Sequence, residues 1–416
     1  MKLSKKIVAV LLAILVVAAC FAGCSSKDNG ETTAPAGDSA QTQAVTDVKV
    51  GFIFLHDENS TYDLNFINAA KEACKNLGIP DENVIMKTNV PENEQCYEAA
   101  ADLVDQGCEF VFADSFSHED YLIQAAKEFP EVQFCHATGT KAHTEMLDNF
   151  HNAFASIYEG RYLAGVAAGM KLNEMIEAGD IKAEEAKMGY VGAYTYAEVI
   201  SGYTSFFLGA KSVCPTVTME VSFTGSWYDE TAEKEAATKL INNGCVLISQ
   251  HADSMGAPTA CENAGVPNIS YNGSTVSACP NTFIVSSRIN WAPYFEYAIK
   301  ATAAGEAIDA DWTGTLATGS VELTEVNAQA AAEGTQEAID AAKADLEAGK
   351  IHVFDTANFT VEGKTLDTYQ ADIDTDPEFK GDTEVISDGY FHESEYRSAP
   401  AFDVQIDGIE LLNTAF

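Results

Sequence analysis

The sequence predicts an α/β protein made of two doubly wound lobes, each built on a mostly parallel sheet. Short runs of β-branched and aromatic residues alternate with helical patterns along most of the chain, and the connections between them are short. The chain has 416 residues, which is more than one compact core usually holds, and its 46% of hydrophobic residues is enough for two well-packed lobes. In such sheets ligands bind outside the carboxyl ends of the strands, so two facing lobes predict a cleft.

The first 23 residues predict a secretory signal that is removed. Lysines near the start precede an apolar run at 7–22, which is shorter than the ~20 residues needed to span a bilayer. Phe21-Ala22-Gly23-Cys24 is similar to a bacterial lipobox, which makes Cys24 the expected lipidation site. Cys20 is a weaker alternative acceptor, and an ordinary cleaved signal with a chance cysteine is the other interpretation.

Residues 24–47 predict a flexible tether that holds the folded part beside the membrane. This stretch is rich in Ser, Thr, Ala, Gly and Asp and has too few apolar residues to form a core. We therefore expect a lipid-anchored protein on the extracytoplasmic face of the cell membrane. The formal net charge of −39 would repel nucleic-acid backbones and acidic lipid surfaces, so no nucleic-acid partner is expected.

The first half of the folded part shows three strand-to-helix units and a further strand. A β-branched and aromatic run at 48–55 is followed by a polar loop and then by apolar residues at helical spacing. The same order then repeats. The expected strands are 48–55, 84–87, 109–113 and 132–136, and the expected helices are 62–77, 94–106 and 118–129.

The second half repeats this rhythm after a long helix at 158–172, which we interpret as a crossing between lobes. A second crossing is expected near 282–287, where a strand precedes a helix at 292–304. The other expected strands are 188–192, 217–223, 245–249, 268–271, 314–323 and 350–354, and the other expected helices are 196–212, 229–242, 255–264 and 327–348. Residues 355–400 have few apolar runs and predict surface loops, with 392–395 facing solvent.

These crossings divide the chain into two expected lobes. The first lobe takes 48–150 together with 281–306. The second takes 151–280 together with 307–416, including a C-terminal extension.

The eight cysteines that follow Cys24 are isolated and form no CxxC pair or Cys/His metal spacing. This pattern argues against a metal site. The chain also lacks GxSxG, Walker A, HExxH and a strand-linked GxGxxG, which lowers the case for an enzyme and leaves no expected cofactor.

Aromatic, carboxylate and amide side chains instead gather where expected strands end. Planar heterocycles stack on indole and phenol rings, while carboxylates and amides bond to their polar edges. A cleft lined this way suits a flat, polar, uncharged ring. The candidate ligand-binding residues are Asn59, Tyr62, Asp63, Ser115, Phe116, Tyr196, Trp227, Asp253, Asn272 and Trp291.

Several of these residues have a plainer interpretation. Trp227 could anchor the packing between lobes, Tyr62 and Phe116 could belong to the core at a helix start, and Asp63 could only favour a helix N-terminus. His251 could suggest a metal ligand or a base, but we favour a hydrogen-bonded loop histidine.

Two segments carry a family resemblance. The stretch at 152–165, which contains Tyr158-Glu159-Gly160-Arg161-Tyr162-Leu163-Ala164-Gly165, resembles the basic membrane protein (BMP) family, and so does Gly225-Ser226-Trp227-Tyr228-Asp229. These are PnrA-like lipoproteins that serve as purine nucleoside-binding components of ABC importers. The resemblance implies a type I periplasmic-binding-protein fold, a hinge of three strands, a purine ligand, an ABC permease as partner and no enzymatic activity. We also expect a monomer.

The resemblance also implies roles for individual residues. Tyr62 and Phe116 would stack from the first lobe, Tyr196 and Trp227 would stack from the second, and Asp253 with Asn272 would read polar atoms.

The chain departs from the better-known nucleoside branch at two places. His251-Ala252-Asp253-Ser254 stands where that branch has a Gly-rich turn, and Ser270-Tyr271-Asn272 replaces a Gly-Val-Asp triplet. These forms resemble the purine-binding branch, so a free base such as adenine is as plausible as adenosine. The alternatives are a sugar receptor, a ligand sensor of the same fold and, less favoured, a nucleoside hydrolase.

Overall fold

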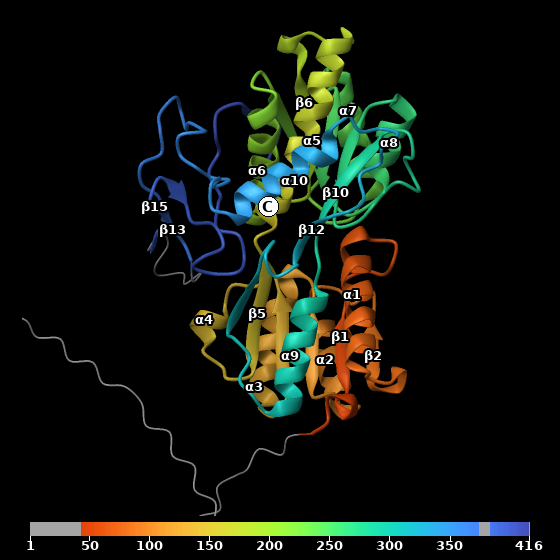
Figure 1. Ribbon diagram of the computed structural model, residues 1–416. Coiled ribbons are helices and arrows are strands. Elements are labelled where there is room, and N and C mark those ends of the chain that lie inside the picture. The colour runs from red at the N-terminus through yellow and green to blue at the C-terminus, as the bar shows by residue number, and fades with distance from the viewer. Residues whose placement is uncertain (1–42, 374–382, 416) are drawn as a thin grey trace, which may run out of the picture. The chain divides into compact units, whose positions relative to one another are not determined.

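The computed structural model describes residues 43–373 and 383–415 (Figure 1). The predicted signal at 1–23, Cys24 and the expected tether up to residue 42 lie outside the described residues. Residues 43–47 do not behave as a tether, because the backbone N–H of Gln43 donates to the carbonyl of Ala303 at 3.0 Å. The Gln43 amide also donates to the carboxylate of Glu109. The chain therefore joins the fold before residue 48.

The first lobe is built on a sheet of six strands in the order β11-β5-β4-β3-β1-β2. All five strand pairs are parallel. The strands are β1 (Val50–Ile53), β2 (Val84–Lys87), β3 (Phe110–Ala113), β4 (Gln133–Ala137), β5 (Phe150–Ala155) and β11 (Asp311–Gly314). Its helices are α1 (Thr61–Leu77), α2 (Glu94–Asp105), α3 (Glu119–Glu128), α4 (Ala142–Glu145) and α9 (Ala292–Ala304).

The second lobe is built on a sheet of seven strands in the order β12-β10-β9-β8-β6-β7-β17. Only the pair β10–β12 is antiparallel among the pairs of this sheet. The strands are β6 (Lys187–Gly192), β7 (Thr218–Phe223), β8 (Leu247–His251), β9 (Asn268–Tyr271), β10 (Phe283–Ile289), β12 (Val321–Leu323) and β17 (Ile409–Leu411). Its helices are α5 (Ile157–Ala178), α6 (Ala197–Val213), α7 (Glu230–Asn242), α8 (Gly256–Ala264) and α10 (Thr335–Glu347).

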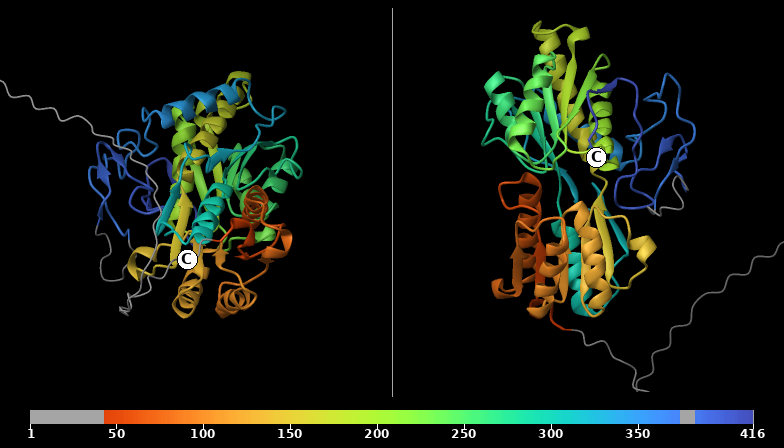
Figure 2. Two further views of the ribbon diagram at one scale, coloured as in Figure 1. Left: turned by 60° about the horizontal axis from the view of Figure 1, so that its bottom comes forward. Right: turned by 180° about the vertical axis from the view of Figure 1, so that it is seen from behind.

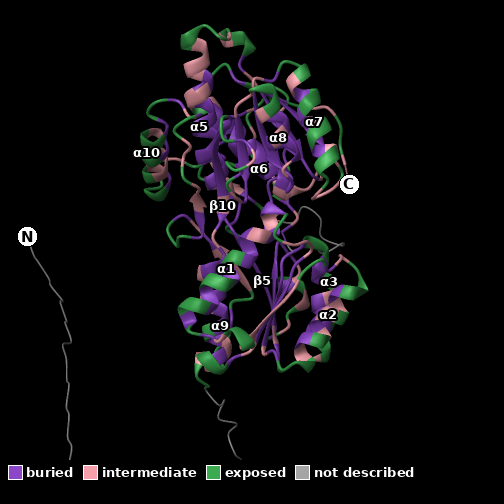
Figure 3. Ribbon diagram, turned by 90° about the vertical axis from the view of Figure 1, so that its right-hand side faces the viewer, coloured by how far each residue is buried: buried purple, intermediate pink, exposed green. Residues whose placement is uncertain are grey.

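These two sheets confirm the predicted α/β class. Buried residues concentrate on the strands, between the helices that cover both faces (Figure 3). Within residues 43–373 and 383–415, every helix is too short or too polar to cross a bilayer.

The chain crosses between the lobes three times. It passes from β5 to α5, from β10 to α9, and from β11 to β12 (Figure 1). The sequence predicted a single strand at 314–323, and this prediction is wrong. The segment contains the end of β11 and all of β12, which are separated by a turn where Gly319 has φ +74°. Three strands also lie in the opposite sheet from the one that the sequence boundaries assign: β5 and β11 pair in the first sheet, and β10 pairs in the second.

Helices α5 and α6 pack closely because each carries a glycine at the contact. A Cβ atom on Gly165 would lie 2.1 Å from the carbonyl oxygen of Phe206, and one on Gly209 would lie 2.0 Å from that of Tyr162. Both distances are far below van der Waals contact, so only glycine allows this approach. The two helices therefore pack backbone against backbone at this contact.

The described residues of the C-terminal extension, 355–373 and 383–407, form more regular structure than the loops expected at 355–400. The extension contains the short pairs β13–β14 (Gln370–Ala371, Thr383–Glu384) and β15–β16 (Ile386–Ser387, Tyr390–Phe391), and it lies beside α6 (Figure 2). Tyr203 on α6 donates to Gln405 at 2.9 Å. The ring of Phe354 stacks on that of Phe402 with centroids 4.2 Å apart.

This packing explains further differences from the sequence expectations. The expected strand at 350–354 does not form, because Phe354 packs from a turn into the core of the extension. Residues 392–394 are buried rather than solvent-facing, and the Glu393 carboxylate accepts the backbone N–H groups of Ala401 and Phe402. The helix expected from 327 begins only at Thr335.

Candidate functional site

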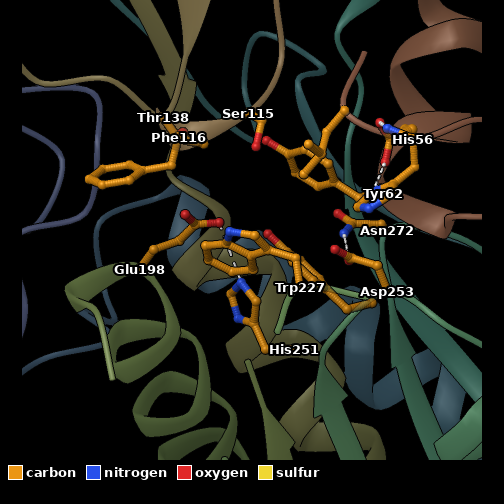
Figure 4. Close-up of a pocket in the computed structure, with 13 residues that line it drawn as sticks. His56, Tyr62, Ser115, Phe116, Thr138, Glu198, Trp227, His251, Asp253 and Asn272 are labelled. Atoms are coloured by element: carbon orange, nitrogen blue, oxygen red, sulfur yellow. Dashed lines mark hydrogen bonds and ion pairs between the residues drawn. The ribbon is translucent and has the colours of Figure 1, made fainter. Parts of the chain in front are cut away.

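A cavity lies between the two lobes at the carboxyl ends of their strands (Figure 4). It holds about 370 Å³ of space, part of which is open to solvent. The first lobe contributes Leu55, His56, Tyr62, Asp63, Ser115, Phe116 and Thr138, and the second contributes Glu198, Trp227, His251, Asp253, Tyr271 and Asn272. This placement agrees with the general rule for ligand sites in doubly wound sheets.

Tyr62 enters the cavity from the first turn of α1. Ser60 caps this helix by accepting the backbone N–H of Asp63, so the turn is fixed in place. The Tyr62 hydroxyl donates to the carbonyl of Asp114 at 2.7 Å, and its ring lies edge-on to Phe66. Tyr62 therefore lines the cavity with its hydroxyl already paired.

Asp63 is buried and bonded within its own lobe. Its Oδ1 accepts the backbone N–H of His56 at 2.7 Å, and its Oδ2 accepts the hydroxyl of Ser60 at 2.6 Å. The Nδ1 of His56 lies 3.4 Å from the same carboxylate. Burial alone would raise the pKa of Asp63, but the hydrogen bonds from His56 and Ser60 outweigh it and lower the pKa.

Three more residues complete the first-lobe wall at the ends of β3 and β4. The Ser115 hydroxyl donates to Glu92 at 2.7 Å. Phe116 starts a 3₁₀ turn and is 39% exposed. Thr138 has φ +68°, and its buried hydroxyl has no partner within the described part of the chain.

The aromatic part of the second-lobe wall is formed by Trp227 in the loop after β7. Its indole packs edge-on against Tyr194, with centroids 5.1 Å apart, and lies 6.2 Å from Tyr196. Tyr196 in turn approaches Phe116 of the first lobe at 5.6 Å. Trp227 and Phe116 therefore belong to one aromatic cluster that spans both lobes.

Asp253 and Asn272 lie together in loops after β8 and β9. The Asn272 amide donates to Asp253 Oδ1 at 3.3 Å. Burial raises the pKa of Asp253 well above its ordinary value, and the nearby carboxylates of Glu233 and Asp63 add to this shift. The backbone carbonyl of Asp253 also accepts the N–H of Thr61 at 3.0 Å, which ties the second lobe to the start of α1.

Glu198, His251 and Tyr271 form the remaining part of the second-lobe wall. His251 ends β8, and its Nε2 lies 3.4 Å from Glu198 Oε1. Its ring is 4.4 Å from that of Tyr271, which ends β9. The Tyr271 hydroxyl is buried and has no partner among the described residues. Burial lowers the pKa of His251, which favours the neutral imidazole.

Seven of the ten predicted site residues line this cavity, and three do not. Asn59 is exposed and bonds to Asp57 in its own loop. Tyr196 contacts the aromatic cluster but is not among the lining residues. Trp291 is 1% exposed and stacks on Phe66 at 4.5 Å, so it belongs to the core of the first lobe.

Several lining residues were not among the predicted site residues. Glu198 is the second residue of α6, at a strand-to-helix junction of the kind that yielded Tyr196. Tyr271 directly precedes Asn272 at the end of a strand, so its position in the sequence could have indicated that it lines the cavity. His251 is hydrogen-bonded, as expected, but it ends strand β8 rather than lying in a loop. Among the described residues, no group of three or more His, Cys, Asp or Glu side chains is placed to hold a metal ion. Leu55, His56 and Thr138 carried no distinct signal.

The sequence pattern of the family described as "ABC transporter substrate-binding protein PnrA-like" matches residues 52–352. The chain belongs to this family. The PnrA-like chain is therefore an ABC transporter substrate-binding protein, of a class that binds small ligands outside the cytoplasm and works with membrane permeases. The family resemblance drawn from the sequence is confirmed.

The PnrA-like chain is similar to three named relatives. It is 32% identical over 261 residues to a purine-binding protein of Brucella abortus, covering 62% of this chain and 69% of the relative. It is 31% identical over 205 residues to a putative ABC transporter glucose-binding protein of Haloferax volcanii, covering 49% of each. It is 25% identical over 264 residues to the ABC transporter nucleoside-binding protein BmpA of Lactococcus lactis, covering 61% of this chain and 67% of the relative.

A solved structure confirms the fold. An ABC transporter solute-binding protein from Conexibacter woesei superposes with a TM-score of 0.60 at 20% identity, covering 73% of this chain and 98% of the other. The type I periplasmic-binding-protein fold expected from the sequence is therefore correct.

Proposed function

We propose that this protein is the receptor of a purine importer and binds a purine base or nucleoside in the cavity between its lobes. The observation that carries the proposal is a cavity with aromatic rings on both lobes and hydrogen-bonding groups between them. A planar ring gains contact with Trp227 from one side and with Tyr62 or Phe116 from the other, while its edge meets carboxylate, amide and phenol groups.

The charge of the lining favours a neutral ligand over a nucleotide. Asp63, Glu198 and Asp253 line the cavity, and none of the lining residues is lysine or arginine. A phosphate group would therefore lie beside acidic side chains without a lysine or arginine to balance its charge. A base or nucleoside carries no such charge, and the relatives named for purine and nucleoside binding support the same choice.

Transport needs a change of shape, and the lobes are connected in a way that allows one. Three crossings join them, and contacts such as Thr61 with Asp253 form only when the lobes approach. A ligand that touches both walls stabilises the closed arrangement, which the permease would then recognise. The receptor acts as a monomer and performs no covalent chemistry in this proposal.

The proposal also places the protein on the outer face of the cell membrane through a lipid on Cys24. The sequence before Cys24 supports this, as does the extracytoplasmic character of the family. In cells, Cys24→Ala should release the protein from the membrane fraction. Retention of the variant would indicate Cys20 or another mode of attachment.

A sugar is the second candidate, because one relative is named as a putative glucose-binding protein. Sugars also stack on tryptophan, but they are puckered and do not fill a two-sided aromatic slot as a flat ring does. The same experiment separates the two candidates.

That experiment is thermal melting of the chain from residue 43 onward against purine and pyrimidine bases, nucleosides and simple sugars. A ligand at 100 times its dissociation constant adds about 2.7 kcal/mol to the unfolding free energy. We expect stabilisation by purines and none by pyrimidines or sugars. Stabilisation by glucose alone, or by none of the compounds with a sample freed of bound ligand by unfolding and refolding, would contradict the proposal.

A further inference from the structure

We propose that Glu198 accepts a hydrogen bond from a donor group on the ligand. We also propose that a buried chain of hydrogen bonds, which we call the relay, runs from Arg161 through Tyr190 and His251 and positions Glu198. The inference rests on the proposed function and adds a specificity rule to it. The cavity would select a ligand that presents an N–H group to the second lobe.

The relay begins at Arg161, which lies on α5 and is fully buried at 0% exposure. Its guanidinium donates to the hydroxyls of Tyr190 at 3.0 Å and Ser249 at 2.9 Å, and to the carbonyl of Ser270 at 3.2 Å. Within the described residues no carboxylate accepts from it. A guanidinium keeps its positive charge in proteins, so this cation is held by neutral groups alone.

The direction of each hydrogen bond follows from that cation. Because a guanidinium can only donate, the oxygen of Tyr190 accepts, and its proton is free for another acceptor. Nδ1 of His251 lies 3.5 Å from that oxygen. A neutral His251 that accepts at Nδ1 carries its proton on Nε2, which lies 3.4 Å from Glu198 Oε1.

Glu198 is thereby fixed as an acceptor at the cavity wall. Its side chain is only 11% exposed, and its single hydrogen bond within the described chain uses Oε1. It also lies in the first turn of α6. Figure 4 shows Glu198 on the side of the cavity opposite Ser115 and Thr138. Oε2 remains available to accept from a ligand.

Specificity follows from this chemistry. An ionised carboxylate accepts hydrogen bonds but donates none, whereas the Asn272 amide can do both. A ligand that placed only acceptor atoms against Glu198 would leave a partly buried charge facing lone pairs, which is costly. The amino group of adenine, or a ring N–H of a purine, meets the requirement.

The test is calorimetric titration of the full chain with adenine and hypoxanthine, using the tighter of the two as the probe. Glu198→Gln keeps the size of the side chain and removes its charge, so it should weaken binding about tenfold or more. Glu230→Gln is the matched control, because Glu230 starts helix α7 with an exposed side chain outside the cavity. The control should bind within twofold of the unaltered protein.

The relay is tested by Tyr190→Phe, alone and combined with Glu198→Gln. We expect Tyr190→Phe to weaken binding severalfold by itself and to add nothing in the double variant, since it acts only through Glu198. Losses that simply add would overturn the relay, as packing damage would give that result. Thermal melting of each variant identifies any that fails to fold, in which case Tyr190→Phe is replaced by His251→Gln.

The outcomes separate the two proposals. If the unaltered protein binds neither purine, the proposed function fails and this inference fails with it. If it binds one of them and Glu198→Gln binds equally well, the purine receptor stands and only the role of Glu198 is overturned.

Discussion

The two walls of the cavity use their polar groups differently. On the first-lobe wall, Tyr62 is bonded to the Asp114 carbonyl, Asp63 to Ser60 and His56, and Ser115 to Glu92. On the second-lobe wall, the Tyr271 hydroxyl is buried without a partner among the described residues, and Glu198 has one bonded oxygen.

This difference determines which wall can form new hydrogen bonds with a ligand. Groups that are already paired gain little from a ligand, whereas a buried group without a partner gains a full hydrogen bond when the ligand arrives. The first lobe therefore supplies a wall whose polar groups are mostly paired already, and the second lobe supplies polar groups that can bond to the edge of the ligand. Thr138 is the exception on the first-lobe wall, because its buried hydroxyl is also unpaired within the described chain.

The largest expected effect comes from removing the indole of the second-lobe wall. Trp227→Ala should weaken purine binding about tenfold or more, because stacking of a base on an aromatic ring contributes ~1–3 kcal/mol. Trp227 is only half-buried, so the melting temperature of the ligand-free protein should change little. Calorimetric titration measures the affinity, and unchanged binding would remove Trp227 from the site.

The next effect isolates a single oxygen on the second-lobe wall. Tyr271→Phe should weaken purine binding about three- to tenfold, since it deletes a hydroxyl that can pair only with the ligand or water. The unfolding free energy of the ligand-free protein should not fall, because no internal hydrogen bond is lost. A variant with normal affinity and reduced stability would contradict this division between the walls.

The matched change on the first-lobe wall should give the reverse pattern. Tyr62→Phe removes a hydroxyl that donates to the Asp114 carbonyl, so the unfolding free energy should fall by about 1 kcal/mol. Affinity for the purine should stay within about twofold. Urea unfolding and titration of the same sample provide both numbers, and a large loss of affinity would show that Tyr62 reads the ligand.

The smallest effect is a difference in pH dependence between the lobes. Burial raises the pKa of Glu233, which supports the Asp253 loop by accepting the N–H of Ser254, to about 7 from 4.5. A raised pKa in the folded state stabilises the protein below pH 4.5, and this contribution is lost as the pH rises through 7. As the pH rises from 4.5 to about 7, the unfolding free energy of the unaltered protein should therefore fall relative to that of Glu233→Gln.

Asp63 on the first lobe should respond in the opposite sense. Its pKa is lowered, so its contribution is present above its ordinary value of 3.8 and is lost as the pH falls below that value. Urea unfolding from pH 3 to 8 for Asp63→Asn and Glu233→Gln checks both signs. If the unfolding free energies of the two variants, each relative to the unaltered protein, changed with pH in the same direction, the predicted difference between the lobes would be wrong.

The sequence predicted aromatic and polar lining residues of the cavity about equally well, but it missed Glu198 and Tyr271. Trp227, Phe116 and Tyr62 follow strand ends, and that local position was enough to place them at the cavity. Nothing in the local sequence distinguishes Glu198 from other acidic residues in the first turn of a helix. Its role depends on His251, which is distant in sequence.

The errors in the fold have the same origin. Trp291 also stands at a strand-to-helix junction, but it faces Phe66 across the core of the first lobe. Strands β10 and β11 have ordinary strand patterns, and only long-range pairing decides which sheet they join. The extension has almost no periodic pattern, so the burial of Glu393 could not be read from local sequence.

The most direct test of the account is a crystal structure of the protein with a bound purine. We predict that the ring lies against Trp227 in the cavity, with its hydrogen-bonding edge toward Glu198, Tyr271 and Asn272. A purine whose edge bonds instead to Asp63 and Ser115, or one bound outside the cavity, would contradict the claim that the second lobe reads the ligand.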